Sequence, residues 1–121
     1  MNDMIDALVK KLIEDTKANK IKWHKPKYFE EYAIDRAKYY TNIAEIGDIT
    51  ISKTEDDEIY FNITEKDIAK DSDNINLNID YNSDYYVNMM RLYNLANGTY
   101  MKRISNGSLG QAITAYINRP N

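Results

Sequence analysis

One segment near the N-terminal end combines basic and aromatic side chains that could bind nucleic acid. Lysines recur from Lys17 to Lys27, interleaved with Trp23, His24 and Tyr28. Lysines neutralise phosphates and aromatic rings stack on bases, so this pattern suits a weak nucleic-acid or nucleotide-ligand binder. Specific base reading is disfavoured, because bidentate contacts to bases come from arginine. The candidate residues are Lys20, Lys22, Trp23, His24, Lys25, Lys27 and Tyr28; the alternative is a solvated basic collar with Trp23 packed against the first helix.

The chain offers few residues that could act as a catalytic nucleophile or bind a metal ion. The sequence has no cysteine and therefore no cysteine nucleophile, and it has one histidine, His24, so a Ser-His-Asp triad would have to use that imidazole. No serine or carboxylate close to it in sequence marks a triad, and a multi-histidine or thiolate metal site cannot be built. We therefore expect no catalytic residue and no metal ion.

Phosphate and calcium motifs are also missing. The four glycines never fall in the G-x-G-x-x-G or G-x-x-x-x-G-K spacing that lets backbone amides approach a pyrophosphate. Asp71 opens a stretch like a calcium loop, but Asn76 stands at the glycine position and Asn82 at the bidentate glutamate position. We expect no cofactor, and a binding protein rather than an enzyme.

The middle third of the chain is strongly acidic. Residues 1–44 sum to +2, residues 45–84 hold twelve acids and three bases, and residues 85–121 hold four bases and no acid. Four consecutive acids, Glu55 to Glu58, crowd one expected turn. Successive turns of an antiparallel sheet alternate between its ends, so these acids and the later ones from Glu65 onward should form two separate negative poles. The candidate partner-binding residues are Glu55, Asp56, Asp57, Glu58 and Tyr60; the alternative is a solvated loop.

Two kinds of periodicity predict the elements that position these residues. Apolar residues with helical spacing begin after Asp3 and end near Asn19, and a second helical stripe follows Pro26, although a strand could open near Tyr39. A third helix should begin near Ser83 and stop at Gly98, and a last short helix should bury Leu109, Ala112, Ile113, Tyr116 and Ile117.

Between the helices the period changes to two, as in strands with one buried face. Alternating residues centre on Ile49, Phe61 and Leu77, extend to Tyr81, and are separated by short polar turns. The expected fold is α+β: one or two N-terminal helices, a three- to four-stranded antiparallel meander, and C-terminal helices packed on one sheet face. The expected core is Leu8, Val9, Leu12, Ile13, Trp23, Ile49, Ile51, Phe61, Ile63, Leu77, Ile79, Met90, Tyr93, Ile113 and Ile117.

Length and composition describe the setting. At 121 residues, with 43% hydrophobic and 29% charged residues, the chain fits a single domain over residues 1–121. The absence of cysteine and of a long apolar run predicts a cytoplasmic protein that does not bind a membrane. An excess of Asn, Ile, Lys and Tyr, with lysine far above arginine, indicates a low-GC bacterium or one of its mobile elements.

The motifs carry one resemblance. The stretch Leu12-Ile13-Glu14-x-Thr16-Lys17-x-x-Lys20-Ile21-Lys22-Trp23, with the later Leu92-Tyr93-x-Leu95-Ala96, resembles a loose group of small bacterial and phage proteins. Those proteins begin with a helix, a Thr-Lys step and a Lys-x-Trp, and close with a Leu-Tyr-x-x-Ala helix. The resemblance implies an architecture and a prokaryotic setting, and brings no activity with it.

These observations predict a small binding protein with a protein partner. One form of this hypothesis is a phage or mobile-element inhibitor of a host defence protein, acting through an acidic, tyrosine-rich surface. Eleven tyrosines in one small domain are too many to bury with every hydroxyl bonded, so several should be exposed at a binding surface. The alternative is the nucleic-acid or nucleotide-ligand binder described above.

Overall fold

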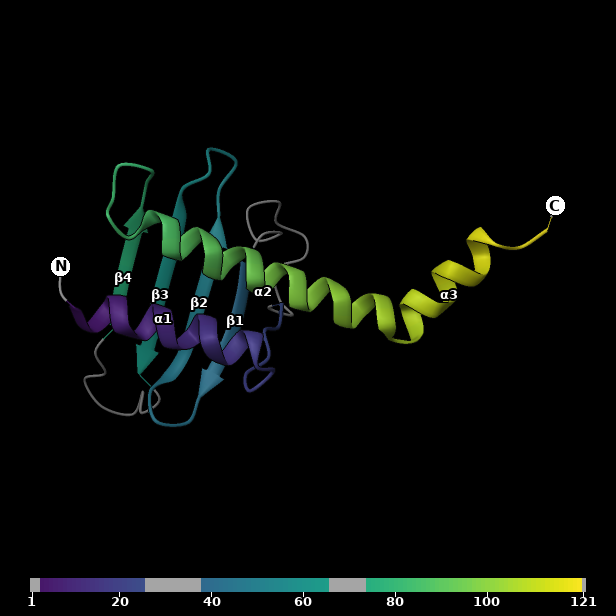
Figure 1. Cartoon of the computed structure of the whole chain (residues 1–121), viewed down its shortest axis with the longest axis horizontal. Coiled ribbons are helices and arrows are strands. Elements are labelled where there is room, and N and C mark those ends of the chain that lie inside the picture. The colour runs from purple at the N-terminus through teal and green to yellow at the C-terminus, as the bar shows by residue number, and fades with distance from the viewer. Residues whose placement is uncertain (1–2, 26–37, 66–73, 121) are drawn as a thin grey trace.

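The protein is a two-layer α+β domain in which two helices cover one face of an antiparallel sheet (Figure 1). A computed structural model describes residues 3–25, 38–65 and 74–120. Its elements, in chain order, are α1 (Asp3–Lys17), β1 (Lys38–Ile43), β2 (Gly47–Lys53), β3 (Ile59–Glu65), β4 (Asn74–Ile79), α2 (Tyr86–Asn106) and α3 (Ser108–Ile117). The predicted fold class is confirmed.

The four strands form a meander in the order β1-β2-β3-β4, with every neighbouring pair antiparallel. One row of the register runs Tyr39, Ile51, Phe61 and Leu77, so odd-numbered residues of all four strands share one face. That face carries the apolar side chains expected from the period of two. The even-numbered residues form a face of hydroxyl and amide side chains, to which Tyr60 belongs.

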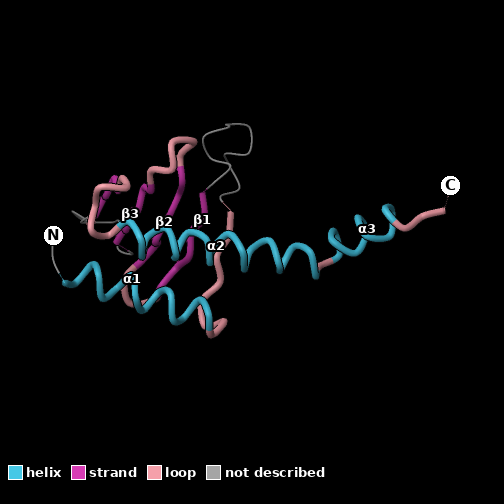
Figure 2. Tube along the Cα trace, turned by 45° about the horizontal axis from the view of Figure 1, so that its top comes forward, coloured by secondary structure: helices cyan, strands magenta, loops and turns pink. Residues whose placement is uncertain are grey.

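The core lies between the odd-numbered sheet face and the two helices, which run side by side across it (Figure 2). Trp23, Ile49, Ile51, Ile59, Phe61, Met89 and Leu92 have no exposed surface. Three residues expected in the core, Leu8, Leu77 and Met90, are half-buried and pack against it. Burial of this apolar surface is the main stabilising contribution to the fold.

Helix α1 begins and ends as its sequence predicts. Its apolar stripe buries Val9 and Leu12, and lysines and acids occupy its outer side. At its end Asn19 adopts a left-handed backbone with φ of 60°. The Lys20 amide bonds the carbonyl of Asp15 at 2.8 Å and the Asn19 amide bonds that of Thr16 at 3.1 Å. This is a Schellman ending, with asparagine in the place that glycine takes most often.

The C-terminal third differs from the prediction in two ways. Helix α2 does not stop at Gly98 but continues to Asn106. The expected burial of α3 is also wrong: Gly110 is buried, but Leu109, Ile113, Tyr116 and Ile117 are 49–72% exposed, and Ala112 is exposed as well. Helix α3 contacts α2 at an elbow and projects from the body (Figure 1). Ile113 and Ile117 are therefore not core residues.

Two further expectations concern the strand ends. Tyr81, expected to continue the buried alternation of the last strand, lies beyond β4 and is 78% exposed. The second helix expected after Pro26 falls mainly on residues 26–37, outside the described residues, and the alternative strand near Tyr39 is present as β1.

Candidate functional site

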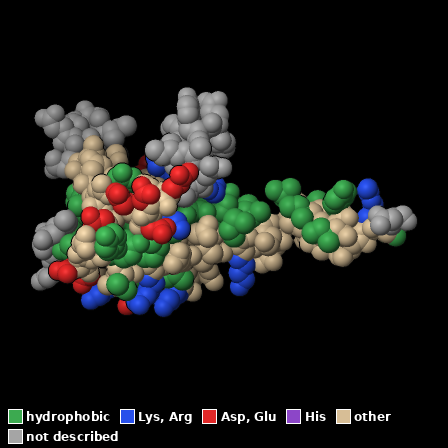
Figure 3. Space-filling view, turned by 90° about the horizontal axis from the view of Figure 1, so that it is seen from above, with side chains coloured by type: hydrophobic (Ala, Val, Ile, Leu, Met, Phe, Trp, Pro, Cys, Tyr) green, Lys and Arg blue, Asp and Glu red, His purple; other side chains and the backbone are tan. Residues whose placement is uncertain are grey.

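Six carboxylates gather at one end of the sheet. Four lie in the β2–β3 turn and two in the β4–α2 loop, and the Tyr86 hydroxyl ties these loops together by donating to the Asp57 carbonyl oxygen at 2.9 Å. Figure 3 looks down on this end, where acidic side chains cluster. We call this surface the acidic pole: Glu55, Asp56, Asp57, Glu58, Asp80 and Asp84.

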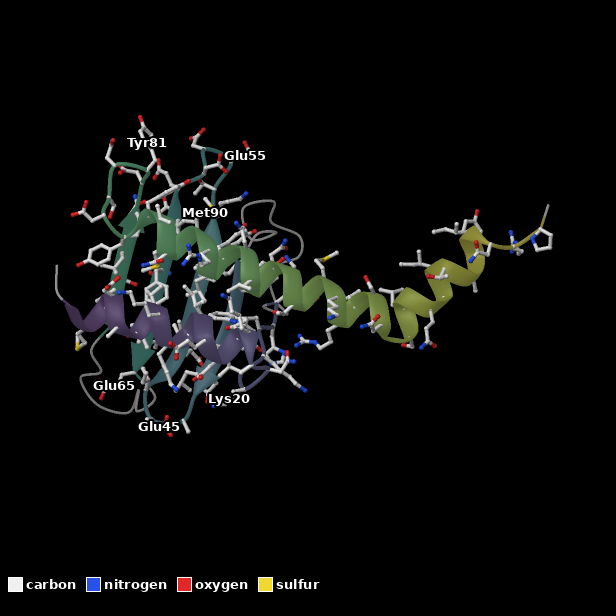
Figure 4. The ribbon with its side chains drawn as sticks, in the orientation of Figure 1. Lys20, Glu45, Glu55, Glu65, Tyr81 and Met90 are labelled. Carbon is white, nitrogen blue, oxygen red and sulfur yellow. The ribbon has the colours of Figure 1, made fainter. Side chains whose placement is uncertain are left out.

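Asp80 and Asp84 were expected with the later acids, and the structure corrects that grouping. Strand β4 runs antiparallel to β3, so it returns the chain to the end where the β2–β3 turn lies. The expected separation into two ends holds for the labelled residues, since Glu55 and Glu65 lie at opposite ends (Figure 4). Asp67, Asp71 and Asp73 lie outside the described residues.

The acidic turn has a defined backbone. The Thr54 amide donates to the Glu58 carbonyl at 3.0 Å, and the Asp57 amide to the Thr54 carbonyl at 3.1 Å. The Thr54 hydroxyl accepts from the Glu58 amide at 3.1 Å. Asp57 has φ of 62°, a conformation that aspartate tolerates better than most residues. Its carboxylate lies 3.5 Å from the Lys53 ammonium, an exposed pair of little energetic weight.

Exposed apolar side chains accompany the carboxylates. Tyr81 stands on the β4–α2 loop at the same end as Glu55 (Figure 4) and is 78% exposed. Val87, next to the bonded Tyr86 at the start of α2, is 67% exposed. Tyr60 is 38% exposed on the polar sheet face. Sequence reasoning missed both side chains as candidates: Tyr81 belongs to an alternation that predicts burial, and Val87 lies outside the apolar stripe of its helix and carried no signal of its own.

The fold places the side chains of the basic and aromatic segment in different surroundings. Trp23 is fully buried, and its indole Nε1 donates to the Thr16 hydroxyl at 3.0 Å, so its ring is not available for stacking on a base. The Lys25 ammonium lies 4.6 Å from the centre of the Tyr39 ring, over the edge of the core. Lys20 and Lys22 are exposed, whereas Lys27 and Tyr28 lie outside the described residues.

His24 joins this segment to the sheet. Its backbone amide and carbonyl exchange 2.8 Å hydrogen bonds with those of Tyr40, and the two rings are 5.6 Å apart. Desolvation first, and then the charges of Arg103 and Lys22, lower the pKa of His24 below its usual 6.5. The exposed imidazole is therefore held neutral at pH 7 beside two cations.

A basic groove runs between the end of α1 and the second half of α2. Its volume is about 490 Å³, and it is lined by Thr16, Lys17, Asn19, Ile21, Lys22, Leu95, Thr99, Lys102, Arg103 and Asn106. Two of its four cations come from the predicted segment. Sequence reasoning missed Lys102 and Arg103, because it ended the preceding helix at Gly98; their signal was the absence of acids after Asp84.

No protein-family model, curated protein or solved structure matches the chain. Within the described ranges, no helix combines the length and hydrophobicity needed to cross a membrane. The same ranges contain no group of three or more His, Cys, Asp or Glu residues arranged to hold a metal ion.

Proposed function

We propose that this is a non-enzymatic binding protein that recognises a basic protein partner through the acidic pole. The observation that carries the proposal is the joining of two acidic loops around exposed apolar side chains. Charged groups of one sign guide encounter with a partner of opposite sign, and an exposed tyrosine supplies contact area at low entropic cost.

The geometry favours this surface over a merely solvated loop. Backbone bonds hold the turn at Thr54 and Asp57, and the hydroxyl of Tyr86, the first residue of α2, bonds the turn at the point where the second loop ends. The carboxylates are therefore presented on an ordered scaffold, so little conformational entropy is lost when a partner binds. Tyr81 and Val87 supply the apolar contacts that a charged surface alone lacks.

The test compares two variants with the same change of net charge. The pole variant carries Glu55→Ser, Asp56→Asn, Asp57→Asn and Glu58→Ser; asparagine at 57 suits the left-handed backbone there. The matched control variant removes four negative charges elsewhere: Asp6→Asn, Glu14→Ser, Glu45→Ser and Glu65→Ser.

The wild type and both variants are used to capture proteins from a low-GC bacterial lysate, and a captured protein is then purified for association kinetics. We expect the pole variant to associate roughly tenfold more slowly at low salt, with less difference at high salt, while the control keeps the wild-type rate. A pole variant with unchanged rate and salt dependence would show that the turn is only a solvated loop.

We further propose that the partner is a host defence protein, inhibited by a phage or mobile-element product. Small size, low-GC composition and the acidic surface support this finer proposal. Expression of the chain in a host with an active defence system should restore phage plating, and expression of the pole variant should not. Equal plating with the wild type and with an empty vector, across several defence systems, would refute it.

A further inference from the structure

The basic groove concentrates positive charge from two elements that are distant in sequence. Lys17 and Lys22 come from the end of α1 and the turn after it, and Lys102 and Arg103 come from the last two turns of α2. Among the described residues that line the groove, none is acidic. The four cations around the basic groove repel one another, and an anion bound between them is attracted by all four.

Arg103 is held in place before any ligand arrives. Its guanidinium donates a hydrogen bond to the Trp23 carbonyl oxygen at 2.6 Å and lies 5.5 Å from the centre of the Tyr100 ring. Trp23 is itself anchored in the core by its bond to Thr16. A guanidinium carries five donors, so this one bond leaves others that can point to a ligand oxygen. The positioning of Arg103 lowers the entropic cost of binding.

The rest of the lining indicates what kind of anion fits. Ile21 and Leu95 give the groove an apolar component, and Asn19 and Asn106 add amide groups that can donate or accept. The volume of about 490 Å³ falls within the range of small-molecule sites. No aromatic ring is among the described lining residues, and Trp23 is buried. Base stacking, on which single-stranded nucleic-acid sites depend, is therefore not offered here.

We propose that the basic groove binds a small phosphorylated ligand, with its phosphates between the four cations and its less polar part against Ile21 and Leu95. Phosphate oxygens accept charge-assisted hydrogen bonds from lysine and arginine, which are among the strongest polar contacts in proteins. This proposal does not depend on the acidic pole, because the two surfaces share no residue.

The test uses inorganic pyrophosphate and ATP as probes, with adenosine as the uncharged comparison and a ten-nucleotide oligothymidine as the polymer comparison. Binding is followed by calorimetry and by backbone amide chemical shifts. The groove variant is Lys22→Gln with Lys102→Gln. The matched control variant is Lys10→Gln with Lys11→Gln, which removes two exposed charges from the outer side of α1. All four side chains are exposed, so neither variant should affect folding.

We expect pyrophosphate and ATP to shift amides over residues 16–22 and 95–106, and adenosine to leave them unchanged. The groove variant should bind about a hundredfold more weakly, because it loses two charge-assisted hydrogen bonds that are each worth about tenfold in affinity, whereas the control should bind normally. Burial lowers the pKa of His24 most, and the charges of Arg103 and Lys22 lower it further; because a bound pyrophosphate neutralises those two charges, it should raise that pKa.

Three results would overturn the proposal. The first is no binding of either probe at millimolar concentration. The second is equal weakening in the groove and control variants, which would indicate diffuse attraction to net charge. The third is oligothymidine binding far more tightly than ATP over the same amides, which would make the groove part of a nucleic-acid surface instead.

Discussion

The buried bond between Trp23 and Thr16 should be worth more to stability than its single contact suggests. The indole Nε1 donates to the Thr16 hydroxyl at 3.0 Å, and that hydroxyl donates to the Leu12 carbonyl at 2.6 Å. Trp23 is fully buried and Thr16 is 1% exposed. Thr16→Val keeps the shape and removes the hydroxyl, so the indole N–H is left in the core without a partner.

The loss of stability in Thr16→Val is estimated from the two groups that the Thr16 hydroxyl bonds, the Trp23 indole N–H and the Leu12 carbonyl. An unsatisfied buried donor costs about 1–3 kcal/mol, and this term falls on the Trp23 N–H. The Leu12 carbonyl loses its side-chain donor but keeps the backbone bond of the helix, so its cost is small. We expect Thr16→Val to lower the free energy of unfolding by about 2 kcal/mol, a large share of the 5–15 kcal/mol typical of a domain.

A double-mutant cycle isolates the bond. The variants are Thr16→Val, Trp23→Phe and their combination, followed by urea unfolding with far-ultraviolet circular dichroism, because Trp23 is the single tryptophan. Without the indole N–H, loss of the hydroxyl should matter little, giving a coupling of about 1 kcal/mol or more. Thr99→Val is the matched control: its hydroxyl bonds the Ala96 carbonyl of its own helix, so the change should stay within about 0.5 kcal/mol. A coupling near zero would refute the reasoning.

Three other predictions test separate parts of the fold. Gly110→Ala places a Cβ 2.1 Å from the Ser105 carbonyl oxygen, so we expect the α2–α3 elbow to open; spin-label distances across it should lengthen while core unfolding is unchanged, and unchanged distances would contradict the packed elbow. The pKa of His24, followed by NMR, should lie below 6.5 and should move toward 6.5 in high salt or in Arg103→Gln. The contribution of neutral His24 to the free energy of unfolding should be complete above pH 6.5 and should be lost as the pH falls through the pKa of the folded state. Burial first, then the neighbouring tyrosines, raises the pKa of Tyr39 to about 12, so its contribution to unfolding free energy is complete below pH 10 and lost as pH rises through 12; Tyr39→Phe should flatten that pH dependence.

Local patterns in the sequence were sufficient for the body of the fold. The apolar stripe of α1 and its ending at Asn19 follow from helical spacing and backbone preference, which act within a few residues. The strands follow from the alternation around Ile49 and Phe61, because one covered face requires a period of two. The opposite placement of Glu55 and Glu65 follows from antiparallel connectivity alone.

The candidate sites depended on contacts that periodicity does not describe. The apolar stripe of α3 predicts a covered face, but a stripe does not say what covers it, and Ile113 and Ile117 are exposed. The basic groove exists because α1 and α2 lie side by side. Their packing places Lys22 and Lys102, which are far apart in the sequence, around the same groove. The grouping of Asp80 with the acidic turn likewise depends on where β4 ends: the strand ends at Ile79, so Asp80 lies in the loop that follows it.

Gly98 shows how tertiary contacts override a local stop signal, and it supplies a last prediction. An Asn-Gly step is a common helix ending, yet α2 continues past it. The reason lies on either side: the Asn97 side chain accepts from the Tyr39 hydroxyl, and the Tyr100 ring packs 5.5 Å from the Tyr39 ring. Of the two, the Tyr100 contact is available only if the helix continues past Gly98, so it offsets the cost of an interior glycine.

That cost can be removed by one substitution. Gly98 is exposed, and a Cβ built on it meets nothing within 4 Å, so Gly98→Ala introduces no clash. Alanine restricts the unfolded chain and favours the helix, so we expect the free energy of unfolding to rise by about 0.5–1 kcal/mol in urea unfolding. If the helix instead stopped at this step, as the sequence alone predicts, the residue would favour a left-handed backbone that alanine resists, and the same change would destabilise the protein. The sign of this one measurement therefore decides whether Lys102 and Arg103 belong to the helix that lines the groove.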